Sequence, residues 1–147
     1  MTRLIPLDLP VWRILPCGLP PATAARAPEG RFHHSGQIAA YASLSAEGAR
    51  VAIQRYLTDA VPRELVPMWL TAPHVVDERG NLAASVVWQD IRAGGKPSPT
   101  WAISDAARAT GAQAMLYSSR SRPDLSHVVV FDPTRLRAVG PATPFVP

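Results

Sequence analysis

Arg31 is the first side chain in the sequence that we consider suited to bind an anion. It stands in segment 30–36, GRFHHSG, between two glycines, and no other residue there carries a fixed charge. A guanidinium presents several fixed donors that suit a diphosphate or a carboxylate. His33 lies in the same segment, and Tyr41 follows Arg31 by ten residues. An aromatic ring there can pack against a flat heterocycle, so the group predicts a nucleotide site. The alternative interpretations involve no ligand: Arg31 could be a solvated turn residue, and the ring of Tyr41 could belong to the hydrophobic core.

A second polar group, Ser118, Ser119 and Arg120, directly follows an apolar run at 114–117. Serine hydroxyls and loop amides beside an arginine suit a phosphate or a ribose. Serine is also an ordinary turn residue, so simple turn chemistry is the competing interpretation. We expect 118–124 to be an exposed loop that contributes to the site.

Strands must position these groups, and β-branched or aromatic runs between turn residues predict them. The predicted strands are 11–15, 38–43, 114–117 and 127–131. Apolar runs at 65–70 and 75–76 are broken by Pro67 and Pro73, which favours edge or bulged strands. The segments 1–10, 16–30 and 140–147 are predicted to be irregular.

Two helices complete the pattern. One begins at Ser45, which suits the N-cap, with Glu47 in the first turn, and Pro62 ends the segment. Its predicted inward, apolar face carries Ala49, Ala52, Ile53, Tyr56 and Leu57. The other helix covers 100–110, with Ser98 or Thr100 as its cap and Gly111 as its stop. Segment 85–91 fits either a short strand or a helical turn.

Length and composition predict one globular domain, 1–147. The chain has 147 residues, 47% of them hydrophobic and 18% charged. The net charge is +4, but the arginines are scattered, which argues against direct nucleic-acid binding. Apolar runs are too short to cross a membrane and no signal-peptide pattern is evident, so a cytoplasmic protein is expected.

Several kinds of active site are not indicated. The chain lacks the glycine pattern of a dinucleotide-binding Rossmann fold, a phosphate-binding P-loop, a zinc-protease motif and a nucleophile elbow. Adjacent His33 and His34 would point apart on a strand, and there is a single cysteine, so no metal site is expected. His74 and His127, in apolar surroundings, are predicted to be structural histidines.

Taken in order, these segments resemble the RES domain, a family named for its Arg, Glu and Ser. The resemblance runs from about residue 11 to residue 137, and its individual motifs are short. It rests on the segments 12–14 (WRI), 30–32 (GRF), Tyr41 with 45–49 (SAEGA), Trp88, 117–120 (YSSR) and 128–131 (VVVF).

The resemblance implies specific roles. Arg31 matches the family arginine and Tyr41 its tyrosine. Ser119 is the better match to the family serine, and Ser118 is the neighbouring alternative. The family glutamate should lie seven residues after Ser45, where this chain has Ala52.

The resemblance also implies a compact α/β (α+β) fold similar to ADP-ribosyltransferase toxins, with mixed β-sheets and flanking helices. It further implies NAD as co-substrate. The implied partners are a helix-turn-helix (Xre-like) antitoxin, expected to cover the active site, and a protein target. A missing glutamate should impair free hydrolysis, because general-base assistance contributes ~10²–10⁴-fold. It therefore favours the ParT-like branch, which ADP-ribosylates phosphoribosyl pyrophosphate synthetase. The alternatives are an NAD glycohydrolase or phosphorylase, and an inactive module that only binds its antitoxin.

Overall fold

A computed structural model describes residues 3–147. Five strands form a closed ring in the order β1-β2-β5-β4-β3, with β3 pairing back onto β1. They are β1 (Leu4–Pro16), β2 (Ala40–Ser43), β3 (Arg63–Asp77), β4 (Ala114–Ser118) and β5 (Ser126–Val130). The pairing of β3 with β4 is parallel and the other pairings are antiparallel. The expected α/β (α+β) class, with a mixed sheet and flanking helices, is therefore confirmed.

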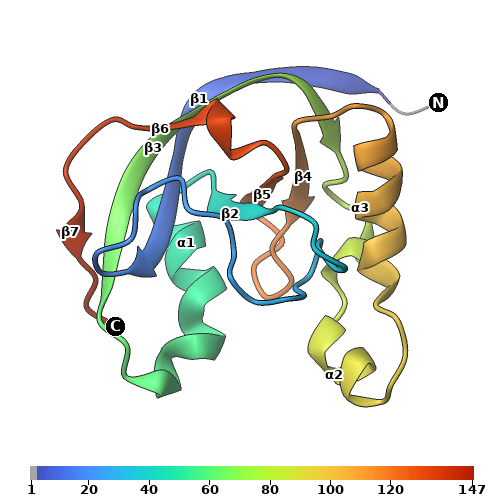
Figure 1. Cartoon of the computed structure of the whole chain (residues 1–147), viewed down its shortest axis with the longest axis horizontal. Helices are drawn as coiled ribbons and strands as arrows, with labels where there is room; N and C mark the ends of the chain where they lie inside the picture. Colours follow the sequence, from blue (N-terminus) through green and yellow to red (C-terminus); the bar gives the residue numbers. More distant parts are fainter. Residues whose placement is uncertain (1–2) are drawn as a thin grey trace.

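β1 and β3 arch side by side as two long curved strands (Figure 1). The prediction that residues 1–10 are irregular is wrong from Leu4 onward, and residues 1–2 lie outside the described part. Pro6 and Pro10 are the reason that the first half of β1 was not predicted from the sequence. Proline cannot donate to a ladder, which makes a run that contains it look unlike a strand.

The prediction of two short edge strands at 65–70 and 75–76 is also wrong, because β3 is continuous and paired on both sides. The carbonyl of Pro67 accepts from the N–H of Val139. Its missing donor therefore faces β6 (Leu136–Ala138) and β7 (Thr143–Pro144), which are short, and does not interrupt the β1 ladder. At Pro73 the register shifts between Ile5 and Leu7, so the predicted bulge is present there.

Two of the helices begin directly after the capping serines that the sequence predicted. Ser45 accepts from the N–H of Gly48 at the start of α1 (Ala46–Ile53), which continues as a 3₁₀ helix, Gln54–Asp59. Segment 85–91 contains helical turns and no strand: a 3₁₀ turn, Leu82–Ser85, and α2 (Trp88–Ala93) are separated by two non-helical residues. Ser98 caps α3 (Pro99–Ala109), and Gly111 follows with a φ of +81°, which glycine adopts without strain.

Two hydrophobic clusters lie on the two faces of the sheet. All five strands contribute to the first cluster, which therefore fills the ring; Val11, Met68, Leu70, Leu116 and Val128 are at its centre. The second cluster packs Phe32, Met115, Tyr117 and Val129 against α3 and the 3₁₀ turn before α2. The β2, β5 and β4 strands are shared by both clusters, and their outer face forms the floor of the functional site.

The tail 140–147 is irregular apart from the two residues of β7. No helix within residues 3–147 combines the length and hydropathy that a membrane crossing requires.

Candidate functional site

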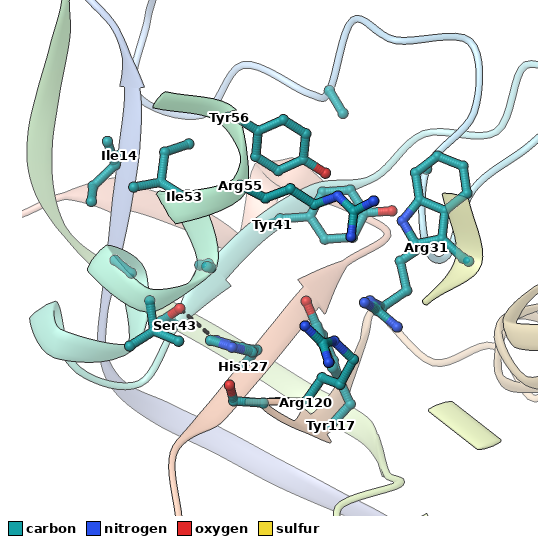
Figure 2. Close-up of a pocket in the computed structure, with 18 of the residues that line it drawn as sticks. Ile14, Arg31, Tyr41, Ser43, Ile53, Arg55, Tyr56, Tyr117, Arg120 and His127 are labelled. Carbon is teal, nitrogen blue, oxygen red and sulfur yellow. Dashed lines mark hydrogen bonds between the residues drawn. The ribbon is translucent and has the colours of Figure 1, made fainter. Parts of the chain in front are cut away.

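A cavity of about 560 Å³ opens between α1, the segment before β2, α2 and the outer face of β2, β5 and β4 (Figure 2). This volume is in the range of ligand pockets, ~300–1,000 Å³. All the side chains singled out from the sequence line it: Arg31, His33, Tyr41, Ser118, Ser119 and Arg120. Residues some 90 positions apart in the chain thus meet at one site.

Arg31 lies at this site with no carboxylate partner among the described residues. Its Nη1 donates to the carbonyls of Val86 (2.6 Å) and Ala84 (3.2 Å). Burial lowers the pKa of the guanidinium, and the nearby Arg120 lowers it further. A desolvated cation held only by carbonyls is well placed to receive an anionic ligand.

Helix α3 fixes the backbone around Arg31. Three of its side chains satisfy three successive carbonyls: Trp101 Nε1 donates to Gly30 O (2.8 Å), Thr100 Oγ1 to Arg31 O and Arg108 Nη2 to Phe32 O (2.7 Å). Farther along the segment, Asp105 accepts from His34 and Gln37. We call these contacts the α3 clasp; it explains why Arg31 is ordered in a glycine-flanked segment.

Thr100→Val tests the clasp, because valine keeps the shape and removes only the hydroxyl donor. We expect the variant to unfold ~1–3 kcal/mol more easily, the cost of leaving a buried carbonyl unpaired. Thr100 is fully buried, so water cannot replace the lost donor. Chemical denaturation measures the change, with exposed Thr58→Val as the control. Equal stabilities of the Thr100 and Thr58 variants would show that the clasp does not support the segment.

Tyr41 and His33 form a connected pair. His33 Nε2 lies 2.9 Å from the carbonyl of Ala27, which can only accept, so Nε2 carries the proton. Nδ1 of a neutral His33 then accepts from the Tyr41 hydroxyl (2.8 Å), which itself accepts from the N–H of Phe32 (2.9 Å). A side chain at Gly30 would collide with the His33 ring, so glycine is required there. Both nitrogens of His33 are occupied, and it acts on a ligand only by positioning Tyr41.

The cavity lining is strongly cationic. Among residues 3–147, four arginines line it, Arg13, Arg31, Arg55 and Arg120, against one carboxylate, Glu29. Glu29 is not free, because it accepts from Arg92 Nε at 2.9 Å. In Figure 2 the side chains of Arg31, Arg55 and Arg120 extend toward the same space beside Tyr41. Arg55 and its neighbour Tyr56, which lie on the 3₁₀ continuation of α1, also line the cavity but were not predicted as site residues.

Arg13 supports the floor of the site from β1. It is 4% exposed, and burial lowers its pKa to about 10. Its Nε donates to the carbonyl of Tyr41 (2.9 Å) and its Nη1 to that of Pro21 (2.6 Å). Arg13 thereby joins β1, the long connection after it and β2, and it holds the backbone of Tyr41.

The 118–124 loop is exposed as predicted except at its start. Ser119 is 3% exposed, and its Oγ accepts from the N–H of Arg122. The Ser118 hydroxyl accepts from the N–H of Gly80 and so anchors the turn after β3. Each hydroxyl accepts one backbone N–H in a turn and can still donate its own hydrogen to a ligand. Both serines therefore remain candidates for the family serine.

Ser43 and His127 were not predicted as site residues. They lie directly opposite each other on β2 and β5, and Ser43 Oγ is 2.7 Å from His127 Nδ1 (Figure 2). Burial, together with the charge of Arg31, lowers the pKa of His127 to about 4. Strand alternation offered a signal: Ser43 lies two residues from Tyr41 and so shares its face.

A family model named "RES domain" matches residues 10–146 of the chain. The chain belongs to the RES domain family. A search of curated protein sequences found no match. Among solved structures, a chain of the Mycobacterium tuberculosis MbcT–MbcA toxin–antitoxin complex has the same fold, with a TM-score of 0.72 at 17% identity. The alignment covers 97% of this chain and 86% of that one.

Position 52, where the RES resemblance predicts a glutamate, lies on the cavity wall. The expectation that Ala52 faces inward on an apolar helix face is wrong, because Ala52 is exposed. Within α1 only Gly48 and Ala49 are buried against the sheet. The apolar stripe beyond them borders the open cavity, and hydrophobic spacing alone does not distinguish such a wall from a core.

Proposed function

We propose that this RES domain is a toxin of a toxin–antitoxin system that uses NAD to ADP-ribosylate a protein target. The observation that carries the proposal is the lining of the cavity. Arg31 is desolvated and free of carboxylates, with two further arginines and the ring of Tyr41 around the same space. A dinucleotide offers the complementary features, a diphosphate for the guanidinium groups and flat bases for the rings.

Transfer to a protein is favoured over hydrolysis by the absence of an available carboxylate in the described lining. Glu29 is paired with Arg92 and position 52 is alanine. A target that brings its own nucleophile into the cavity can compensate for weak activation through proximity. The resemblance to the ParT-like branch makes phosphoribosyl pyrophosphate synthetase the first target to test. The second candidate is an NAD glycohydrolase or phosphorylase, for which the size and charge of the cavity are equally suitable.

The proposed partner is a helix-turn-helix antitoxin that covers the cavity. Its support is the toxin–antitoxin complex in which the similar fold was solved, together with the cationic rim, which would attract an acidic segment. We propose no direct nucleic-acid contact.

The function is tested with the purified chain, NAD and phosphoribosyl pyrophosphate synthetase. We expect nicotinamide release that depends on the added protein, with ADP-ribose attached to it by mass spectrometry. Free ADP-ribose without any protein acceptor would instead support the glycohydrolase. Failure to bind NAD, together with normal growth of cells that express the chain alone, would leave only the inactive antitoxin-binding module.

Tyr41→Phe and Tyr41→Ala separate two roles of this ring. We expect Tyr41→Phe to keep most NAD binding, because the ring stays, while loss of the hydroxyl costs ~1–3 kcal/mol of stability at the Phe32 and His33 contacts. Tyr41→Ala should lose both binding and packing. NAD titration and thermal unfolding are measured for each variant. Equal and complete loss of turnover in two folded variants would make the phenol a direct participant in the reaction.

A further inference from the structure

The proposed reaction requires a group in the cavity that receives the proton of the incoming nucleophile. Among the described residues that line it, the only carboxylate is Glu29, which is held by Arg92. Two imidazoles remain. Both nitrogens of His33 are occupied by Tyr41 and Ala27, so His33 has no lone pair to offer. His127 is left.

The geometry of His127 suits this task. The residue is opposite Ser43 on β2 and opposite Tyr117 on β4, so it lies at the middle of the cavity floor. Its Nδ1 is held by Ser43 at 2.7 Å, and the Tyr117 ring lies 5.4 Å away between centroids. Its Nε2 has no hydrogen-bond partner within residues 3–147, nor is it sealed from the cavity as a buried unpaired atom. If Ser43 accepts from Nδ1–H, the Nε2 lone pair is free.

We propose that Nε2 of His127 accepts the proton of the attacking water or target hydroxyl, and that Ser43 positions the imidazole. The inference rests on the proposed function. As the acceptor oxygen bonds to C1′ of the ribose, the C1′–N bond breaks. Its electron pair neutralises the pyridinium, and nicotinamide leaves uncharged. The acceptor's proton passes to Nε2, giving an imidazolium that later returns the proton to solvent.

The surroundings of His127 make its basicity depend on the ligand. Burial and the charge of Arg31 keep the free imidazole neutral, with a pKa of about 4 against an ordinary 6.5. The other titratable groups on the elements packed against β5 are two tyrosines and two charged residues of α1. Tyr41 and Tyr117 are uncharged because burial raises the pKa of both phenols. On α1, Glu47 is paired with Arg122, and the guanidinium of Arg50 lies over the ring of Phe145. A diphosphate bound to Arg31 would offset the repulsion and raise the pKa of His127. The base is therefore strengthened when the substrate is present.

His127→Asn is the test, because its amide can keep a hydrogen bond to Ser43 while Nε2 is lost. Nicotinamide release from NAD is measured in the presence of a bacterial protein extract, so that hydrolysis and transfer are both counted. We expect the rate to fall by ~10²–10⁴-fold with NAD binding retained. Exposed His74→Asn is the matched control and should react at the wild-type rate.

Two further readouts distinguish a base from a structural residue. The wild-type rate should fall as the pH drops from 6.5 toward 4, as His127 becomes protonated, and His127→Asn should lack this acid limb. Added imidazole should restore part of the rate to His127→Ala. The wild-type pH profile requires no variant to fold, and a rate that is constant over this range would overturn the proposal.

The role of His127 and the proposed use of NAD can be overturned separately. If the wild-type chain neither binds nor cleaves NAD, the proposed function falls and the role of His127 falls with it. If the wild-type chain cleaves NAD and His127→Asn does so at the same rate and with the same pH profile, only the role of His127 is overturned.

Discussion

Arg31→Ala should abolish toxicity and leave the fold intact. The side chain of Arg31 is held by two carbonyls and by no ion pair among the described residues, so its removal breaks few contacts within the protein. The α3 clasp binds the backbone of this segment and is retained in the variant. Loss of a charge-assisted contact to a diphosphate should cost ~1.5–3 kcal/mol of binding, or about 10- to 150-fold in affinity.

Arg31→Lys is the informative comparison, because an ammonium keeps the charge without the planar fork. We expect it to restore little. The measurements are NAD affinity by calorimetry, growth arrest on expression, and circular dichroism to verify folding. Arg79→Ala controls for the loss of an arginine that binds Asp77 and does not line the cavity. A folded Arg31→Ala protein that still stops growth would remove Arg31 from the site.

Ala52→Glu should increase the release of free nicotinamide and ADP-ribose from NAD when no target is present. Position 52 is exposed on the cavity wall, so the new carboxylate would be hydrated and should stay ionised beside the arginines of the lining. An added general base contributes typically ~10²–10⁴-fold, and the gain should approach the lower figure in a cavity not built around it.

Two variants control this experiment. Ala52→Gln adds the same bulk without charge, and Gln54→Glu adds the same charge two residues away, at an exposed position that does not line the cavity. Chromatography of the products gives the turnover of each. Unchanged turnover in a folded Ala52→Glu protein would mean that the missing glutamate does not explain the chemistry. The preference for transfer over hydrolysis would then lose its principal support.

Local signals predicted much of the fold. Ser45, Ser98 and Gly111 marked the starts of α1 and α3 and the end of α3, because caps act within one turn. β4 and β5 were found as buried apolar runs. β1 and β3 were shortened or divided, because the effect of a proline in a strand depends on which edge its missing N–H faces. That edge is set by partners far away in the sequence, such as Val139 for Pro67, 72 residues apart.

The candidate site was only partly predictable for the same reason. Arg31, Tyr41 and the serines could be found from residue type and order, and all of them line the cavity. The pairing of Ser43 with His127 depends on the register of β2 against β5, which joins residues 84 apart. Ala52 is exposed because the cavity lies beside α1. The local sequence pattern of the helix does not reveal whether its apolar side faces a cavity or the core.

The strand order has a consequence for the protein during its synthesis. β1 leaves the ribosome first, but its long partner β3 begins only at Arg63, and β2 has to wait for β5, which ends at Val130. Pairings this distant in sequence form late in folding, because the closure of a long loop has to precede them. The cavity floor needs β2, β5 and β4 together, so a nascent chain has to extend at least to Val130, the end of β5, before the floor can form. Any nascent chain that ends before β5 therefore lacks the floor of the proposed NAD site.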